Sequence, residues 1–360
     1  MMIKDSVDVI LWKINNKIKL LNHVKPLNLE EEKQKVFSNF NYNPQFYYSN
    51  LSFNPGNLKQ ILLQLEIKAL PISRVLQLKK EELIKEIELC EYIGKSKFTE
   101  KSIERYGQPK KQQVSSAKND LENIVFEKEA RTIGTEIIYK VIVRRLRQYG
   151  LNWKVEVKDS LADEASAGKT NIIFLRKNLL ISKERLMTMI RHEIDCHALK
   201  AENGKYQPYK IFNYGFPNYL ETEEGQAIYM VNKLGLKTKK IFFPQLRTIL
   251  IDLALDHSFS FIFQRALEYG LEKEEAWNLC SRIKRGLKDT SLPGAFTKDG
   301  VYYPGYLKIK KYLNSNPINS LYLGKVSLEL MEEIKKLPNL VKPRYLPLDF
   351  SQDVLDDLLN

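Results

Sequence analysis

Two of the four histidines in this 360-residue chain fall within six residues, in the stretch HEIDCH from His192 to His197. Imidazole is the commonest metal ligand, and a helix with two histidines beside a glutamate is typical of zinc peptidases, whose glutamate polarises the attacking water. The usual spacing is HExxH, however. Positions i and i+5 of an α-helix diverge by roughly 140°, against roughly 40° for i and i+4. We therefore expect a π-bulge between Glu193 and His197, which would bring both imidazoles to one side.

A catalytic zinc site takes three protein ligands, so a third donor is needed. The segment TEEG, from Thr222 to Gly225, is the obvious source. Thr222 can cap the following helix. Adjacent glutamates on a helix point about 100° apart, so one can face the metal while the other supports the site or faces solvent. The residues alone leave Glu223 and Glu224 both open as the third ligand.

The element that must carry HEIDCH is a helix with recognisable ends. Ser182 stands at the N-cap position, Glu184 in the first turn and Gly204 at the end. Before it, alternating apolar residues at 152–157 and a second β-rich piece at 170–175 predict strands of a small sheet. Helical patterns account for most of the remaining chain, and 38–55 reads as an ordered, irregular segment. We expect an α+β fold that is predominantly helical, with the small sheet placed before the motif helix.

The composition excludes several classes of protein. Hydrophobic residues make up 43% and charged residues 28%, which rules out wholesale disorder. Three scattered cysteines indicate a reduced, cytoplasmic setting, and apolar runs such as 248–255 are too short to span a membrane. Lysine and arginine exceed aspartate and glutamate by 57 − 44 = +13, which favours an acidic partner.

Several motifs together carry a family resemblance. HEIDCH followed by TEEGQA resembles the HEIGTH and TEEGLA motifs of the family that includes the microtubule-associated tyrosine carboxypeptidases (MATCAP) and bacterial proteins with a QEGLP motif. NYNPQFYY at 41–48, YGQP at 106–109 and FTKDGVYYPG at 296–305 also resemble that family, in matching order. The likeness implies a zincin-like zinc metallopeptidase domain at 37–313. Apolar residues at helical spacing predict an N-terminal docking helix within 1–36, and we expect 314–360 to form a C-terminal extension.

The resemblance implies a role for each motif residue. His192 and His197 would bind one zinc ion per chain, and Glu193 would act as general base and proton shuttle. Glu224 is the predicted third ligand, because the EG pair is what TEEGLA and QEGLP share, and Glu223 is the reserve.

The motif also departs from the family pattern at three positions. Asp195 and Cys196 replace glycine and threonine, and Gln226 replaces leucine. An extra carboxylate at Asp195 could raise metal affinity or orient a ligand histidine. We expect Cys196 to be a small buried thiol.

An enzyme that cuts at a C-terminus must also bind the free carboxylate and stabilise a developing oxyanion. Tyr302 is the candidate catalytic donor, and Lys298, from the same FTKDGVYY segment, is the candidate for substrate binding. Arg285 of KRGLK is a further substrate-binding candidate. A structural role is the alternative for each, because the chain holds 57 basic residues and 19 tyrosines.

The leading hypothesis is a zinc-dependent metallocarboxypeptidase. The resemblance implies release of a C-terminal tyrosine or a similar residue, with the acidic α-tubulin tail as the substrate if the source is eukaryotic. One alternative is a pseudoenzyme that keeps zinc for structure. A second is a nucleic-acid-binding protein, suggested by basic runs at 144–147 and 237–240, but no nucleic-acid fold signature accompanies them.

Overall fold

The computed structural model describes residues 6–122, 130–159, 161, 163–168, 170–236 and 238–359. The chain forms two compact units, each built from two separate segments. The first comprises Met1–Asn123 and Phe243–Pro304, and the second comprises Ile124–Phe242 and Gly305–Asn360. Helices predominate in both and the described strands lie in the second, so the predicted α+β, mainly helical fold is confirmed. Among the described residues, no helix is both long and apolar enough to cross a bilayer.

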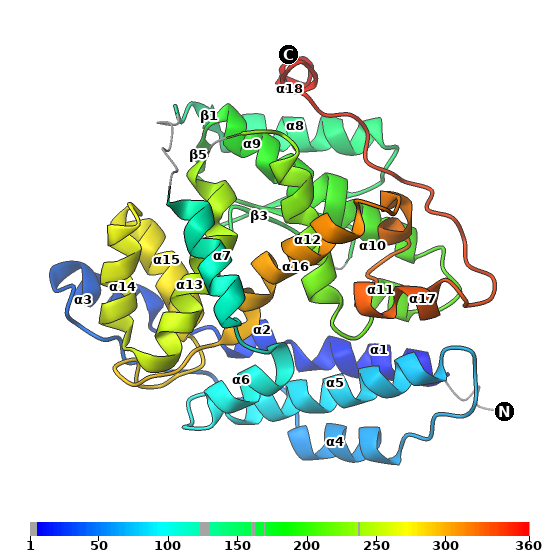
Figure 1. Cartoon of the computed structure of the whole chain (residues 1–360), viewed down its shortest axis with the longest axis horizontal. Helices are drawn as coiled ribbons and strands as arrows, with labels where there is room; N and C mark the ends of the chain where they lie inside the picture. The colour runs from blue at the N-terminus through cyan, green and yellow to red at the C-terminus, as the bar shows by residue number, and fades with distance from the viewer. Residues whose placement is uncertain are drawn as a thin grey trace. The chain divides into compact units, whose positions relative to one another are not determined.

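The first unit is helical (Figure 1). Its elements are α1 (Val7–Ile18), α2 (Leu20–His23), α3 (Leu29–Ser38), α4 (Pro55–Gln64), α5 (Ser73–Glu91), α6 (Phe98–Tyr106), α7 (Lys111–Leu121), α13 (Phe243–Asp256), α14 (Phe259–Glu268), α15 (Lys273–Lys284) and the 3₁₀ helix η3 (Thr297–Val301). Helices α1, α2, α4 and α6 contact the long α5, while α13 contacts α7, α14 and α15. The second group encloses an apolar core that includes Phe259, Phe263 and Trp277. Residues 1–5 of the expected docking helix lie outside the described part of the chain.

The segment predicted to be ordered but irregular runs between α3 and α4 and is held by a buried glutamate. Glu32 Oε2 accepts hydrogen bonds from the backbone N–H of Gln45 (2.7 Å) and the hydroxyl of Tyr42 (2.9 Å). Its other oxygen accepts from Lys35 Nζ at 2.7 Å. Where the segment ends, Asn54 caps α4 by accepting from the N–H of Asn57. The predicted break in helical structure is therefore confirmed.

The second unit contains the strands and the motif helix. Its elements are β1 (Ile133–Gly134), α8 (Thr135–Gln148), β2 (Lys154–Lys158), β3 (Ala165–Ala167), β4 (Ile172–Arg176), β5 (Leu180–Ile181), α9 (Lys183–Met189), the π-helix η1 (Ile190–Ala198), α10 (Leu199–Gly204), α11 (Ile211–Tyr214), α12 (Tyr219–Asn232), η2 (Lys239–Phe242), α16 (Tyr302–Tyr312, of which Gly305 onward belongs here), η4 (Ile318–Tyr322), η5 (Leu328–Leu330), α17 (Met331–Ile334) and α18 (Gln352–Leu359). Lys237 of the basic run lies outside the described residues.

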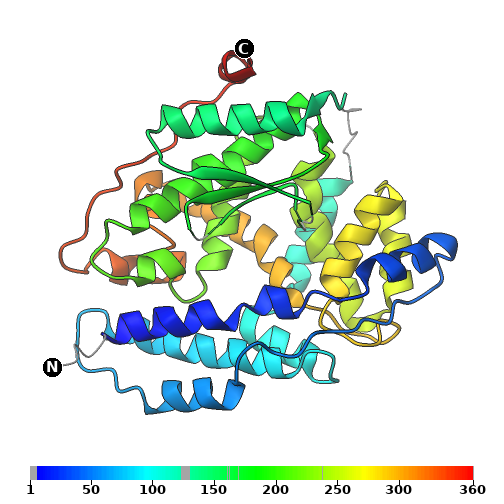
Figure 2. The same cartoon turned by 180° about the vertical axis from the view of Figure 1, so that it is seen from behind.

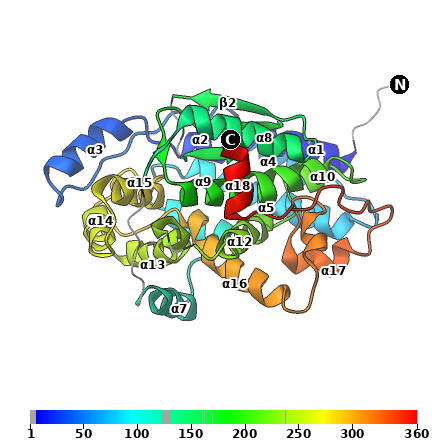
Figure 3. The same ribbon diagram turned by 90° about the horizontal axis from the view of Figure 1, so that it is seen from above.

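A three-stranded sheet with the order β2-β4-β3 lies before the motif helix in sequence, as predicted. Strand β2 pairs with β4 in parallel and β3 pairs with β4 antiparallel, while β1 and β5 form a separate two-stranded sheet. Helix α8 contacts β2 and β4, and Figure 2 shows it running along the sheet. Helix α18 lies across α8 (Figure 3). Ile142, Ile173, Leu186 and Ile190 are among the residues that fill the core between these layers.

Candidate metal centre

The motif helix runs without interruption through α9, η1 and α10. Ser182 Oγ accepts a hydrogen bond from the N–H of Arg185 at 3.0 Å, so the predicted N-cap is confirmed. The nine residues Ile190–Ala198, which contain HEIDCH, wind as a π-helix. The predicted departure from α-helical winding is therefore confirmed, over a longer stretch than the spacing required. In a π-helix the hydrogen bonds join residues five apart, which is the separation of His192 and His197.

Three side chains turn ligand atoms toward one another. Glu224 Oε2 lies 3.4 Å from His192 Nε2 and 3.9 Å from His197 Nε2. The centres of the two imidazole rings are 4.7 Å apart. Two ligand atoms that each lie about 2.1 Å from a tetrahedral zinc ion are separated by roughly 3.4 Å. The observed spacing and the N,N,O donor set therefore fit a single zinc ion.

Glu193 stands beside these three residues. Its Oε1 is 3.9 Å from His192 Nε2, and its Oε2 accepts a hydrogen bond from the N–H of Ala167, in strand β3, at 2.8 Å. His192, Glu193 and His197 also have ligand atoms within 4.8 Å of one another, so distance alone permits Glu193 as a ligand. We favour the base role, because β3 holds one oxygen and leaves the other for a proton. Burial raises the pKa of Glu193 against the opposing charges of the histidines, which suits proton exchange.

Glu223 is a nearly buried neighbour that orients one of the histidines. Its Oε1 lies 3.1 Å from His197 Nδ1, so Nδ1–H donates to the carboxylate and Nε2 is left for a metal. Burial alone lowers the pKa of His197, but the bond to Glu223 and the nearby carboxylates outweigh burial and raise it to about 9. Burial likewise raises the pKa of Glu223, while Lys325, His197 and Lys200 outweigh it and hold the pKa well below its usual range.

Helix α12 positions both glutamates, but its start differs from expectation. It begins at Tyr219, directly after Asn218, whose backbone is left-handed with φ 57°. Thr222 therefore lies inside the helix, and its hydroxyl accepts from the N–H of Leu328 at 2.8 Å. The predicted capping role of Thr222 was wrong, because the helix already extends past it. Adjacent positions on this helix give Glu224 and Glu223 the divergent directions that we expected.

The glycine of TEEG has a packing role. A Cβ atom on Gly225 would lie 2.2 Å from the carbonyl carbon of Gly305, in α16. A Cβ on Gly305 would in turn lie 2.1 Å from the backbone oxygen of Glu221. Neither distance is sterically allowed, so glycine at both positions lets α12 and α16 touch backbone to backbone.

Asp195 does not join the metal-facing group. It is completely buried, and Arg145, Tyr149 and Arg191 donate hydrogen bonds to its two oxygens. These donors occupy its carboxylate, so Asp195 does not orient a ligand histidine through a direct hydrogen bond, and an effect of Asp195 on metal affinity stays a prediction. Cys196 is a buried thiol, as expected, and lies 3.8 Å from the carbonyl oxygen of Glu223.

Lys298 and Arg285 belong to the first unit, where basic side chains surround one buried carboxylate. Asp299 Oδ2 is 3.0 Å from Arg282 Nε and 3.9 Å from Arg247 Nε, and Oδ1 is 3.7 Å from Lys298 Nζ. Burial alone raises the pKa of Asp299, but Arg282, Lys298, Arg247 and Arg285 outweigh it and hold the pKa well below its usual range. We call these four cations the cationic cluster.

Tyr302 adjoins the cationic cluster. Arg247 Cζ lies 4.8 Å and Lys298 Nζ 5.6 Å from the centre of its ring. Arg285 lies over the ring of Phe296 at 5.0 Å. The structure therefore brings the three sequence-predicted residues into one neighbourhood of the first unit. Sequence reasoning missed Arg247 and Arg282, because they come from α13 and α15 and carry no local motif.

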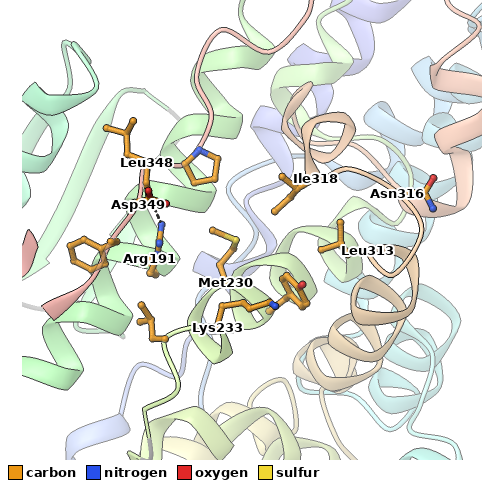
Figure 4. Close-up of a pocket in the computed structure, with 12 residues that line it drawn as sticks. Arg191, Met230, Lys233, Leu313, Asn316, Ile318, Leu348 and Asp349 are labelled. Carbon is orange, nitrogen blue, oxygen red and sulfur yellow. Dashed lines mark hydrogen bonds between the residues drawn. The ribbon is translucent and has the colours of Figure 1, made fainter.

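A separate pocket of about 390 Å³ opens in the second unit (Figure 4). Arg191 lines it together with Leu348 of the C-terminal segment, and Met230 of α12 and Lys233, which directly follows that helix, also line it. Arg191 Nη1 donates to the carbonyl oxygen of Leu348 at 2.9 Å. The pocket thus gives solvent access to one of the residues that bind Asp195.

Comparison with known proteins places the chain in a family. The family model described as microtubule-associated tyrosine carboxypeptidase matches residues 34–355. The chain is 29% identical over 332 residues to microtubule-associated tyrosine carboxypeptidase 1 of Rattus norvegicus, covering 88% of this chain and 62% of that protein. It is 27% identical to the protein of the same name from Homo sapiens over 332 residues, covering 88% of this chain and 61% of that protein.

The chain thus spans about three-fifths of the length of these curated relatives. The family match takes in HEIDCH, TEEG and the whole cationic cluster. Since that match extends over nearly all of both units, this chain belongs to the microtubule-associated tyrosine carboxypeptidase family.

Proposed function

We propose that this protein is a zinc-dependent metallocarboxypeptidase that hydrolyses the C-terminal peptide bond of a protein or peptide and releases tyrosine. The observation that carries the proposal is the convergence of His192 Nε2, His197 Nε2 and Glu224 Oε2 beside the carboxylate of Glu193. The names of the relatives, which describe tyrosine carboxypeptidases, supply the specificity.

Each residue of the centre has a distinct task in this proposal. A zinc ion held by His192, His197 and Glu224 would supply a Lewis acid and lower the pKa of water at the site. Glu193 takes the proton from the attacking water and passes it to the leaving amine, as a general base and acid. The bond from Ala167 fixes one of its oxygens, so the other keeps its direction during this transfer. Glu223 holds the imidazole of His197 in the ligand tautomer.

The substrate side of the proposal rests on the cationic cluster. Lys298 and Arg285 both contribute to the low pKa of Asp299 there, and cationic side chains of this kind bind carboxylates. Lys298 and Arg285 are the proposed partners of the substrate's terminal carboxylate, and Tyr302 is the proposed donor to the developing oxyanion. A chain of net charge +13 attracts an acidic protein tail, so we propose a cytoplasmic substrate of that kind, a tubulin tail in a eukaryotic cell.

Glu193→Gln is the variant that tests the reaction. It preserves size and hydrogen bonding but removes the basic carboxylate. We expect about one zinc ion per chain to remain bound while turnover falls about 10²–10⁴-fold, the usual range for loss of a general base. Elemental analysis measures the metal, and mass spectrometry of a peptide library with varied C-terminal residues measures the products. Glu184→Gln, in the first turn of the same helix, is the matched control and should cleave like wild type.

The products distinguish the alternatives. The proposal is supported if wild type and Glu184→Gln remove single C-terminal residues, tyrosine most efficiently, and Glu193→Gln does not. Internal cuts would replace carboxypeptidase with endopeptidase. Zinc binding without cleavage by any protein would favour the pseudoenzyme.

A further inference from the structure

Asp195 ties the π-helix η1 to two other elements of the second unit. Its Oδ1 accepts from Arg145 Nε (3.0 Å) and the Tyr149 hydroxyl (2.9 Å). Its Oδ2 accepts from Arg145 Nη2 (2.9 Å) and Arg191 Nη1 (2.8 Å). Its backbone carbonyl accepts from the Tyr322 hydroxyl at 2.7 Å. One residue of η1 is thus fixed from α8, from η4 and from within its own helix.

Arg145 is the central partner in this network. It is 1% exposed, and its guanidinium lies 4.9 Å from the ring centre of Tyr149 and 4.8 Å from that of Phe350. It also donates to Gln148 Oε1 and to the backbone oxygen of Leu348. A planar guanidinium can hold both oxygens of a carboxylate while stacked between rings, which an ammonium group cannot do.

The position of Asp195 in the motif connects its hydrogen bonds to the metal centre. Asp195 stands between Glu193 and His197, in the interval that carries the extra residue relative to HExxH. If η1 relaxed to an α-helix, His192 and His197 would diverge by roughly 140° and could not share an ion. π-Helical winding is rare, so contacts from outside the helix must favour it here.

On the basis of the proposed function, we propose that Arg145 and Asp195 are positioning residues. Their buried ion pair holds the π-helical register in which His192 and His197 bind one metal ion. The related motif HEIGTH has glycine where Asp195 stands, so the pair is a feature of this sequence and not of the motif itself.

The test measures metal binding directly. Arg145→Met, Arg145→Lys and Asp195→Asn are compared with wild type by zinc competition against a chromophoric chelator and by the visible absorption of the Co²⁺-loaded protein. We expect Arg145→Met and Asp195→Asn each to weaken zinc binding about 10–100-fold and to change the Co²⁺ spectrum. The Arg145→Met/Asp195→Asn double variant should lose less free energy of zinc binding than the sum of the losses in the two single variants. Arg145→Lys keeps the positive charge but lacks the bidentate guanidinium, so its zinc affinity should lie between that of wild type and that of Arg145→Met.

Arg185→Met is the matched control. Arg185, on α9, forms an ion pair with Glu164 (Nε to Oε2, 2.5 Å) in the same unit. This control should lower the Tm and leave both metal readouts unchanged. If the Arg145 and Asp195 variants behave like the control, the pair serves stability alone and the inference is wrong. Asp195→Asn and Arg145→Lys preserve side-chain size, so the comparison stands even if Arg145→Met does not fold. If wild type binds no zinc, the proposed function and this inference both fail.

Discussion

The two adjacent glutamates of TEEG occupy very different surroundings. The Glu224 side chain is 15% exposed and faces the Nε2 atoms of both motif histidines. The Glu223 side chain is 5% exposed and lies against Nδ1 of His197. The first arrangement suits a metal ligand, and the second suits a group that orients a ligand.

This difference predicts a graded effect on metal binding. Glu224→Gln should remove a ligand and abolish stoichiometric zinc binding at micromolar metal. Glu223→Gln should leave zinc bound but weaken it about 10–100-fold, as the loss of an outer hydrogen-bond partner does. Chelator competition measures both affinities. If Glu223→Gln abolishes binding while Glu224→Gln retains it, the two assignments must be exchanged.

At this scale the sequence predicted some roles and left others open. The five-residue separation of His192 and His197 was enough to predict a π-bulge between Glu193 and His197, because such winding aligns them, but it did not predict that the π-helix extends over Ile190–Ala198. The choice between Glu223 and Glu224 was not determined by their chemistry, since each is a carboxylate on the same helix. The true partners of Asp195 could not be predicted, because Arg145 lies 50 residues away on α8.

At the scale of the elements, the close packing of α12 against α16 depends on glycine at positions 225 and 305. Gly225→Ala should lower the free energy of unfolding by about 1–3 kcal/mol, or more if the helices cannot separate, because its Cβ would overlap the Gly305 carbonyl carbon. Thermal unfolding measures the loss. Gly134→Ala is the control, since no atom lies within 4 Å of its Cβ position. Equal Tm values for the two variants would contradict the predicted close packing.

The segment between α3 and α4 should be sensitive to acid through Glu32. Burial alone raises the pKa of Glu32, but the hydrogen bonds from Lys35, Gln45 and Tyr42 outweigh it and lower the pKa. A lowered folded-state pKa stabilises the protein above the unfolded-state value and loses that effect as the pH falls through the folded-state value. Glu32→Gln should cost about 1.5–3 kcal/mol at pH 7, and the cost should shrink below about pH 4.

Chemical denaturation of wild type and variant across pH measures this cost. Glu31→Gln is the control, because Glu31 pairs with the same Lys35 but its side chain is 65% exposed. A pH-independent difference for Glu32→Gln would show that the carboxylate charge is not what matters.

Element types were largely predictable, whereas one boundary was not. The alternation in 152–157 predicted β2, and the capping pattern at Ser182 predicted the start of the motif helix, because both signals are local. Thr222 is not the cap, because the helix already begins at Tyr219, and its hydroxyl accepts a hydrogen bond from the N–H of Leu328, 106 residues away. The preference of threonine for helix N-caps therefore did not determine this helix boundary.

At the scale of the whole molecule, the net charge can be counted from the sequence, but the division of the chain into two units could not be predicted from it. Hydrophobic periodicity identifies buried faces without stating which faces meet. For that reason it did not reveal that each unit combines an early segment with a late one.

The net charge of +13 predicts a salt effect on the proposed reaction. For a peptide with an acidic tail, kcat/KM should fall about 10-fold between low and high ionic strength, mainly through KM, because salt screens the attraction. Steady-state assays at several salt concentrations measure it. A peptide with the same last residues and a neutral tail is the control. Equal salt dependence of the two peptides would exclude electrostatic recruitment.

The division of the second unit into two segments has a consequence for biosynthesis. HEIDCH and TEEG are translated well before Gly305, Tyr322, Leu348 and Phe350, which complete the packing around α12, Asp195 and Arg145. A nascent chain that ends before Gly305 has all of its metal-ligand candidates but lacks these supporting contacts. The candidate ligands are therefore synthesised early and the residues that pack around them late, so the packing of this unit is complete only near the end of translation.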